Sequence, residues 1–256
     1  MRLTKSLAFS GALALAAMSG GWSVQAAIII DDFNGGAQTI SVGPGDVPMA
    51  SIPKTFTAPE VNYAGAIGGY REVSSVVTDI TTPALARTLL VDINGVDPDT
   101  GLGSMMFTHN QGSTIKAYTV IKWDGLGSAG LGGLDLTQGG ILTAFKIDFI
   151  YADQGIEWNL RVTDTSGEVA DDIFNSAANI NSPTTLYRLL SNFTDDNAAV
   201  DLTSIASIEF FANYPGSQFG VDTVIDMISV IPEPATLALF GAGLFGLGIA
   251  RRRKAA

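Results

Sequence analysis

The chain has 256 residues, enough for one large domain or two small ones, and its 14 basic and 25 acidic side chains give a formal net charge of −11. The absence of cysteine excludes thiol catalysis, cysteine-ligated zinc and iron–sulfur clusters. A single histidine, His109, excludes a site built from several histidines.

The first 26 residues have the organisation of a secretory signal peptide. Arg2 and Lys5 give a positive start, and residues 7–18 form an apolar run that is too short to span a bilayer comfortably. Val24-Gln25-Ala26 then places small residues at the positions that precede a cleavage site. We therefore expect export through the secretory translocon, with cleavage between Ala26 and Ala27. The alternative, a buried first helix, leaves this order of elements unexplained.

Residues 27–231 show the two-residue alternation of half-buried β-strands. Trp158, Leu160 and Val162 alternate with polar residues, for example. Turn-forming pairs such as Ser166-Gly167 and Pro215-Gly216 separate such segments. Strands are predicted at 27–33, 71–80, 86–93, 114–123, 145–151, 158–163, 185–193, 204–212 and 223–231, and a short helix or an irregular loop at 171–184. The sequence thus predicts an all-β fold in one domain, an antiparallel β-sandwich flanked by an N-terminal signal helix and a C-terminal hydrophobic helix.

The last 25 residues, 232–256, form a tail of three parts. Pro232-Glu233-Pro234 cannot continue a helix or a sheet ladder, so this motif stays accessible. Residues 235–250 are apolar and would form a transmembrane helix of about 24 Å, short against a hydrocarbon core of about 30 Å. Four basic residues that resist translocation follow this run: Arg251, Arg252, Arg253 and Lys254.

This tail resembles the PEP-CTERM sorting signal, in which Pro-Glu-Pro, a short hydrophobic helix and a basic end occur in that order. The resemblance implies that an exosortase-type membrane protease recognises the motif in a Gram-negative bacterium. It also implies transient anchoring in the inner membrane, release to the cell surface or the medium, and association with extracellular polysaccharide in a biofilm matrix. The alternative is a plain C-terminal membrane anchor.

The region between the two ends is more acidic than the whole chain. The terminal segments hold six of the basic residues and one acidic residue, which leaves 8 basic and 24 acidic side chains in residues 27–231, a net charge of −16. Such a field repels phosphate backbones, so we expect no nucleic-acid partner. It is compatible with divalent cations and with neutral glycans.

The two ends of the central region carry a second resemblance. Residues 29–33 (Ile-Ile-Asp-Asp-Phe) and the closing segment 219–230 resemble the end strands of jelly-roll modules of the galactose-binding-like and carbohydrate-binding type. In that group a structural calcium is common near the end strands. The resemblance implies that the matching carboxylates here are Asp31, Asp32, Asp222 and Asp226. No other cofactor is expected.

Other motifs have plainer interpretations. Residues 92–99 are rich in oxygen ligands, but their spacing departs from a calcium-binding loop. Gly125–Gly130 matches G-x-G-x-x-G, yet no helix-forming segment follows, so a flexible loop is expected. We expect His109 at a strand end or in a loop, and Trp123 to be the tryptophan with the better chance of exposure.

The leading hypothesis is a non-enzymatic surface or matrix protein that touches glycans through a sheet face or loops. The second is a glycoside hydrolase or polysaccharide lyase, for which Asp148, Asp153 and Glu157 lie nearest to aromatic residues in the sequence. The third is a purely structural matrix subunit without a small ligand.

Overall fold

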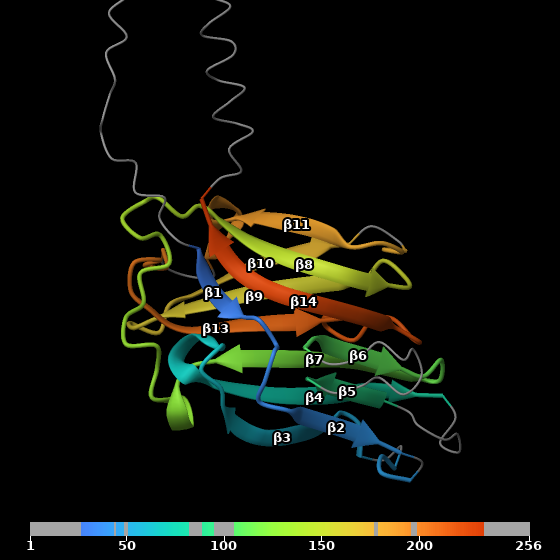
Figure 1. Cartoon of the computed structure of the whole chain (residues 1–256). Coiled ribbons are helices and arrows are strands. Elements are labelled where there is room, and N and C mark those ends of the chain that lie inside the picture. Colours follow the sequence, from blue (N-terminus) through green and yellow to red (C-terminus); the bar gives the residue numbers. More distant parts are fainter. Residues whose placement is uncertain are drawn as a thin grey trace, which may run out of the picture.

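The structure is a computed structural model that describes residues 27–232, apart from residues 44, 49–50, 82–88, 95–104, 177–178 and 196–198. Two antiparallel sheets account for its architecture (Figure 1). The predicted signal helix and the tail after Pro232 lie outside the described residues.

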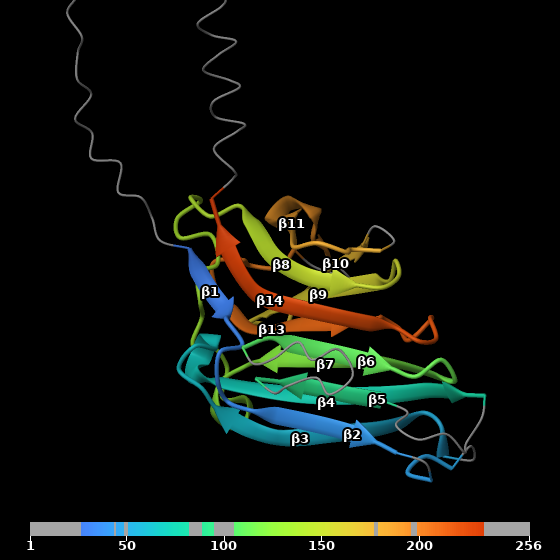
Figure 2. The ribbon, with the colours of Figure 1, turned by 45° about the vertical axis from the view of Figure 1, so that its right-hand side comes forward.

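The first sheet has seven strands in the order β11-β8-β14-β6-β5-β2, and β1 pairs with the end of β14. Its strands are β1 (Ile28–Asp31), β2 (Gln38–Val42), β5 (Leu89–Ile93), β6 (Phe107–Gln111), β8 (Ala144–Ala152), β11 (Thr184–Leu189) and β14 (Asp222–Ile231). Ile28 lies opposite Val230, so the first strand begins where the last one ends. The start of β1 and the end of β14 therefore lie at the same end of the sandwich (Figure 2).

The second sheet also has seven strands, in the order β12-β10-β9-β13-β7-β4-β3. They are β3 (Lys54–Asn62), β4 (Tyr70–Ile80), β7 (Ile115–Trp123), β9 (Glu157–Asp164), β10 (Val169–Asn175), β12 (Thr194–Asp195) and β13 (Ile205–Ala212). Three short 3₁₀ turns, η2 (Ile67–Gly69), η3 (Leu126–Ser128) and η4 (Leu190–Asn192), lie in the connections.

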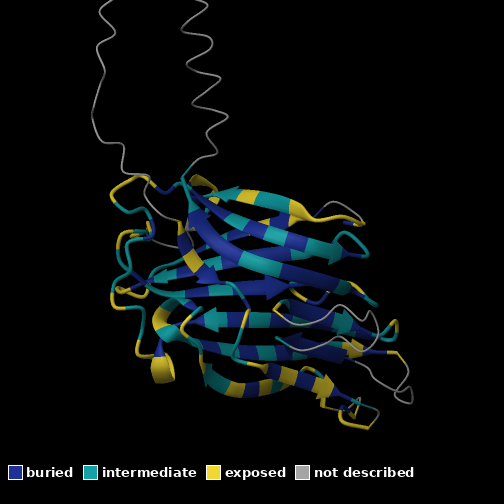
Figure 3. Ribbon diagram, in the orientation of Figure 1, coloured by how far each residue is buried: buried dark blue, intermediate teal, exposed yellow. Residues whose placement is uncertain are grey.

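The sheets pack face to face because each strand turns its alternate apolar residues inward. Along β7, every second residue from Ile115 to Trp123 is buried and the residues between them are half-buried. Trp158 of the second sheet packs edge-on against Phe149 of the first, with ring centroids 4.9 Å apart. Figure 3 shows buried segments alternating with half-buried ones along the strands of the sandwich. The predicted all-β antiparallel sandwich is confirmed.

The nine predicted strands are confirmed, with boundaries shifted by a few residues, but other strands escaped prediction. Strand β10 occupies residues 169–175, so the helix or loop expected from 171 onward is wrong there. Strands β2, β3, β6 and the two-residue β12 were also missed. Pro59 within β3 argued against a strand, but β3 is an edge strand, where a missing N–H is tolerated.

The G-x-G-x-x-G segment forms the expected loop after β7. Gly125 has φ 74° and ψ 175°, a conformation open essentially to glycine alone. A Cβ atom added there would lie 2.7 Å from the carbonyl oxygen of Gly130. The glycines therefore serve a tight turn, and the dinucleotide interpretation has no helix to support it.

Replacing Gly125 with alanine is expected to lower the free energy of unfolding by about 2–4 kcal/mol, because strain and a backbone clash add. Gly127→Ala is the matched control, since Gly127 has φ 57° and ψ 36° and open space around the added Cβ. It should cost only about 1–2 kcal/mol. Urea unfolding of both variants measures the difference, and equal costs would contradict this account of the loop.

Candidate ligand-binding groove

A row of alternating charges crosses the outer face of the second sheet. The strand register places Glu72 of β4 opposite Lys122 of β7, and Lys122 opposite Glu209 of β13. The row continues because Glu209 lies opposite Arg161 of β9, and Arg161 opposite Asp171 of β10. Directly opposite residues in an antiparallel sheet share a face, so all five side chains project from the same surface.

These charges are held by neighbours of opposite sign. Arg161 forms a two-pronged pair with Asp171, with Nε–Oδ1 at 2.9 Å and Nη2–Oδ2 at 3.0 Å. Lys122 Nζ lies 2.5 Å from Oδ2 of Asp124. Arg161 also approaches Glu209, with Nη1 and Oε2 4.0 Å apart. The face thus combines donors and acceptors in fixed positions without a strong charge of one sign.

Partial burial shifts the pKa values of two residues in this row. Burial raises the pKa of Glu209, and the nearby Arg161 and Lys122 only partly offset that effect. Burial also disfavours the charged form of Lys122. The hydrogen bond to Asp124 and the surrounding carboxylates outweigh it, so that the pKa of Lys122 is raised.

An aromatic cluster adjoins the charged row. Phe211 lies two residues beyond Glu209 on β13, and the Arg161 guanidinium carbon sits 5.3 Å from the centre of its ring. Tyr214 packs edge-on against Phe211 at 5.0 Å and against Tyr118 at 5.9 Å. The rings extend the same face beyond the charges.

Between them lies a groove with a volume of about 370 Å³. It crosses strands β3, β4, β7, β13 and β9 and is lined by Thr55, Thr57, Glu72, Ser74, Val120, Lys122, Arg161, Glu209 and Phe211. Hydroxyl groups lie on the β3 and β4 side, and the charged side chains run across the groove from β4 to β9. Phe211 on β13 is only 6% exposed, whereas Tyr118 and Tyr214 beside it are half-buried. Such a surface can make many hydrogen bonds to a polar ligand and pack against its apolar parts.

The four carboxylates proposed for calcium have separate roles. Asp31 is fully buried and accepts hydrogen bonds from Arg71 Nη1, at 2.9 and 2.8 Å, and from Trp123 Nε1, at 2.8 Å. Asp32 accepts from the Tyr63 hydroxyl at 2.5 Å. Asp222, at the start of β14, accepts from the backbone of Gln111.

Asp226 is half-buried on β14, and burial together with the nearby Asp148 raises its pKa. Among the described residues, no group of three or more histidine or carboxylate side chains is placed to hold a metal ion. A structural calcium at Asp31, Asp32, Asp222 and Asp226 therefore stays a prediction without geometric support.

The carboxylates of the hydrolase hypothesis have separate surroundings. Asp148 projects from the outer face of the first sheet, where it pairs with Lys146 at 2.5 Å. Glu157 begins β9 in the second sheet, and Asp153 accepts a hydrogen bond from the backbone of Asp222. Trp158 is buried between the sheets and stacks on Phe210 at 5.5 Å.

Two expectations for single residues are wrong. Trp123 is completely buried, because its indole N–H is needed by Asp31 inside the sandwich. His109 lies in the middle of β6 and is also completely buried. Its Nδ1 lies 2.8 Å from Thr119 Oγ1 of the other sheet, and its Nε2 lies 3.2 Å from Gln111 Oε1. A neutral network explains how a polar histidine occupies the core.

The groove residues themselves escaped sequence analysis. Their signal was present in part, since Lys122, Arg161 and Glu209 occupy polar positions of predicted strands. Alternation shows which residues of one strand share a face. It does not show which strands are neighbours or in which register they pair, so the row could not be assembled from the sequence.

Comparison with known proteins gives distant structural likenesses. No curated protein matches the sequence. The family 11 carbohydrate-binding module of a cellulosomal cellulase of Clostridium thermocellum is 14% identical, with a TM-score of 0.39, over 81% of this chain and 95% of that one. The family 30 module of another cellulosomal cellulase of that organism is 14% identical, with a TM-score of 0.39, over 61% and 87%.

An exo-beta-agarase structure is 15% identical, with a TM-score of 0.39, over 62% of this chain. This chain spans only 24% of that protein, and 20% of another large protein that it matches. Likenesses at this level carry no information about a ligand.

The tail gives the specific match. Residues 230–254 match the PEP-CTERM protein-sorting motif, which includes Pro232, Glu233, Pro234 and the basic residues Arg251 to Lys254. No helix within the described part of the chain is long and apolar enough to cross a membrane, and residues 235–250 lie outside that part. The chain carries a PEP-CTERM sorting tail, and the protein is exported and sorted to the cell surface.

Proposed function

We propose that the protein is a non-enzymatic surface or matrix protein whose sandwich binds a polysaccharide in the groove of the second sheet. The observation that carries this proposal is the register of Glu72, Lys122, Glu209, Arg161 and Asp171 beside an aromatic cluster. This single surface offers both kinds of contact that a sugar chain needs.

The chemistry of the groove fits a ligand rich in hydroxyl groups. Carboxylates such as Glu209 accept hydrogen bonds and cations such as Arg161 donate them, while the half-buried rings of Tyr118 and Tyr214 at the edge of the groove can pack against the C–H face of a sugar. Since Arg161 and Lys122 are already paired, a neutral ligand leaves no buried charge without a partner. The acidic domain, at −16, would repel a polyanion.

Delivery to the site of action follows from the two terminal segments. The signal peptide engages the secretory translocon, and the tail anchors the chain briefly in the inner membrane of a Gram-negative cell. An exosortase-type protease then processes the motif and frees the protein for the cell surface or the extracellular matrix. The transmembrane helix at 235–250 and cleavage between Ala26 and Ala27 are parts of this proposal.

The test compares two equivalent lysines on opposite faces of the sandwich. Lys122→Gln alters the groove and Tyr118→Leu alters the half-buried ring at its edge, whereas Lys146→Gln removes a lysine of similar exposure, paired with Asp148, from the first sheet. Affinity electrophoresis and titration calorimetry on a panel of neutral and anionic polysaccharides measure binding. We expect the groove variants to lose about tenfold or more in affinity, which corresponds to about 1.4 kcal/mol, and the Lys146 variant to bind normally.

Failure of the exported protein to bind any polysaccharide on the panel would sink the proposal. Equal losses for Lys122→Gln and Lys146→Gln would also move the binding site away from the groove. Hydrolysis or elimination products in the same assays would instead support the enzyme hypothesis.

A further inference from the structure

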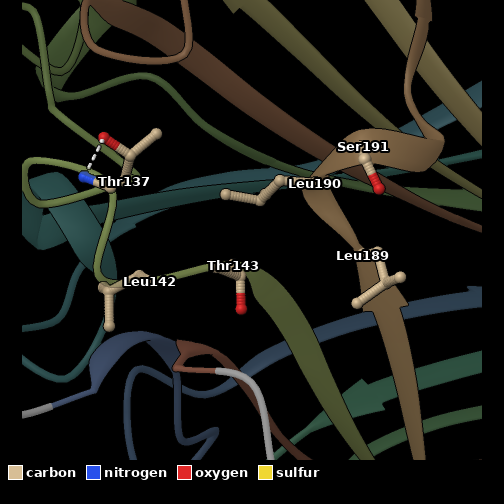
Figure 4. A pocket seen from close by; sticks show the side chains of 7 residues that line it. Thr137, Leu142, Thr143, Leu189, Leu190 and Ser191 are labelled. Atoms are coloured by element: carbon tan, nitrogen blue, oxygen red, sulfur yellow. Dashed lines mark hydrogen bonds between the residues drawn. The ribbon is translucent and has the colours of Figure 1, made fainter.

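A second, smaller pocket lies at the end of the sandwich, away from the groove (Figure 4). Its volume is about 220 Å³, and two chain segments form it: the turn before β8 and the junction of β11 with η4. The lining residues are Thr137, Gly140, Leu142, Thr143, Leu189, Leu190 and Ser191. In Figure 4 these side chains come from both segments and surround a shared space.

This pocket adjoins the point at which the chain passes from the sandwich into the sorting tail. The backbone N–H of Thr143 donates to the carbonyl of Ile231, the last residue of β14, at 2.9 Å. The N–H of Leu190 in turn donates to the carbonyl of Thr143 at 2.8 Å. The segment before β8 is thus hydrogen-bonded directly to Ile231, the residue before Pro232. The β11–η4 junction is linked to Ile231 through Thr143.

The chemistry of the pocket is complementary to a proline-rich segment. Apolar surface comes from the half-buried Leu189 and from the edges of Leu142 and Leu190, which are 1% and 7% exposed. The hydroxyl oxygen of Thr143 is buried without a hydrogen-bond partner among the described residues. Leaving such a group unsatisfied is unfavourable, so an acceptor supplied by another segment would stabilise it. Pro232 and Pro234 offer apolar rings and carbonyl acceptors, but no N–H groups that would themselves need acceptors.

We propose that this pocket binds the sorting motif of its own chain. The ring of Pro234 packs against the leucines, and the hydroxyl of Thr143 donates to a carbonyl of the motif. Each extended residue spans at most about 3.3–3.6 Å, so Pro234 lies within about 11 Å of Ile231, and the leucines beside Thr143 fall within its range. The domain would thus hold the Pro-Glu-Pro motif at a fixed place before the protease takes it.

Disulfide trapping in the full-length chain tests the proposal, because the protein has no native cysteine. Ser191→Cys labels the exposed rim of the pocket, and Ala235→Cys labels the residue after Pro234. A disulfide requires the two Cα atoms to approach to about 4.4–6.8 Å. We expect this pair to oxidise within one chain several-fold more completely than the control pair Ile29→Cys with Ala235→Cys.

Ile29 is a matched control because it is 47% exposed and lies on β1, which flanks the end of β14 on the other side. Adding Pro234→Ala to the Ser191–Ala235 pair should lower its yield several-fold. Equal yields for the two pairs, or no effect of Pro234→Ala, would overturn the proposal. Bonds that form only between chains would assign the pocket to a second copy and overturn it as well.

Discussion

Replacing Arg71 with methionine is expected to lower the free energy of unfolding by about 3–5 kcal/mol. Arg71 and Asp31 are both fully buried, and the pair joins β4 of the second sheet to β1 of the first. Burial already raises the pKa of Asp31, even with Arg71 and Trp123 bonded to it. Without the guanidinium, the carboxylate must either stay charged in the core or take up a proton. Urea unfolding with a fluorescence readout measures the loss.

A double variant separates the missing charge from the missing packing. Asp31→Leu combined with Arg71→Met leaves no buried charge and should recover most of the loss. Trp123→Phe keeps an aromatic ring but removes the N–H that donates to Asp31. The lost hydrogen bond alone should cost about 1–3 kcal/mol, and the smaller ring adds the cost of a cavity. If Arg71→Met unfolds at the same urea concentration as the natural chain, the ion pair has no such role.

The second large effect concerns pH. Complete burial lowers the pKa of His109 to about 4, against an ordinary value of 6.5. Between pH 4 and 6.5, His109 therefore binds a proton in the unfolded chain but stays neutral in the folded protein. The stabilisation is fully present above about pH 6.5 and declines as the pH falls toward 4. Integrated over this interval it amounts to about 3 kcal/mol.

His109→Asn is the control, because it removes the titrating group from the same network with Thr119 and Gln111. The variant should be less stable at neutral pH, but its stability should vary less between pH 6.5 and 4 than that of the natural protein. Carboxylates contribute to both proteins alike, so the difference between the two pH profiles isolates His109. Parallel profiles would show that His109 takes up its proton as readily in the folded protein as in the unfolded chain, and would contradict the lowered pKa.

The sequence was informative wherever one segment could be interpreted without its partners. Alternation located β7, β8 and β9, and the order of Pro232, the apolar run and the basic end identified the tail. Prediction from alternation failed where polar residues are buried in a strand. Strand β6 reads Phe-Thr-His-Asn-Gln, which is largely polar, yet it lies in the first sheet because His109 and Gln111 find partners inside the sandwich.

The site was harder to predict than the fold for a related reason. Lys122, Arg161 and Glu209 are ordinary outward-facing residues on three separate strands, and only pairing across β7, β13 and β9 turns them into a row. Trp123 shows the converse. It is the last residue of a strand and precedes a glycine loop, a position typical of exposure. Its side chain is nevertheless buried, because its indole N–H donates to the buried carboxylate of Asp31, which is far away in the sequence.

The placement of β14 has a mechanical consequence. Its end is bonded to β8 on one side and to β1 on the other, while its beginning pairs with β6. If the groove of the second sheet holds the proposed polysaccharide, a pull on the tail applies force parallel to these strands. Their hydrogen bonds must then shear together, whereas a strand peeled from its edge loses them one at a time. In the proposed anchored state, before the protease acts, tension on the tail would thus pass through a strand that pairs with three neighbours.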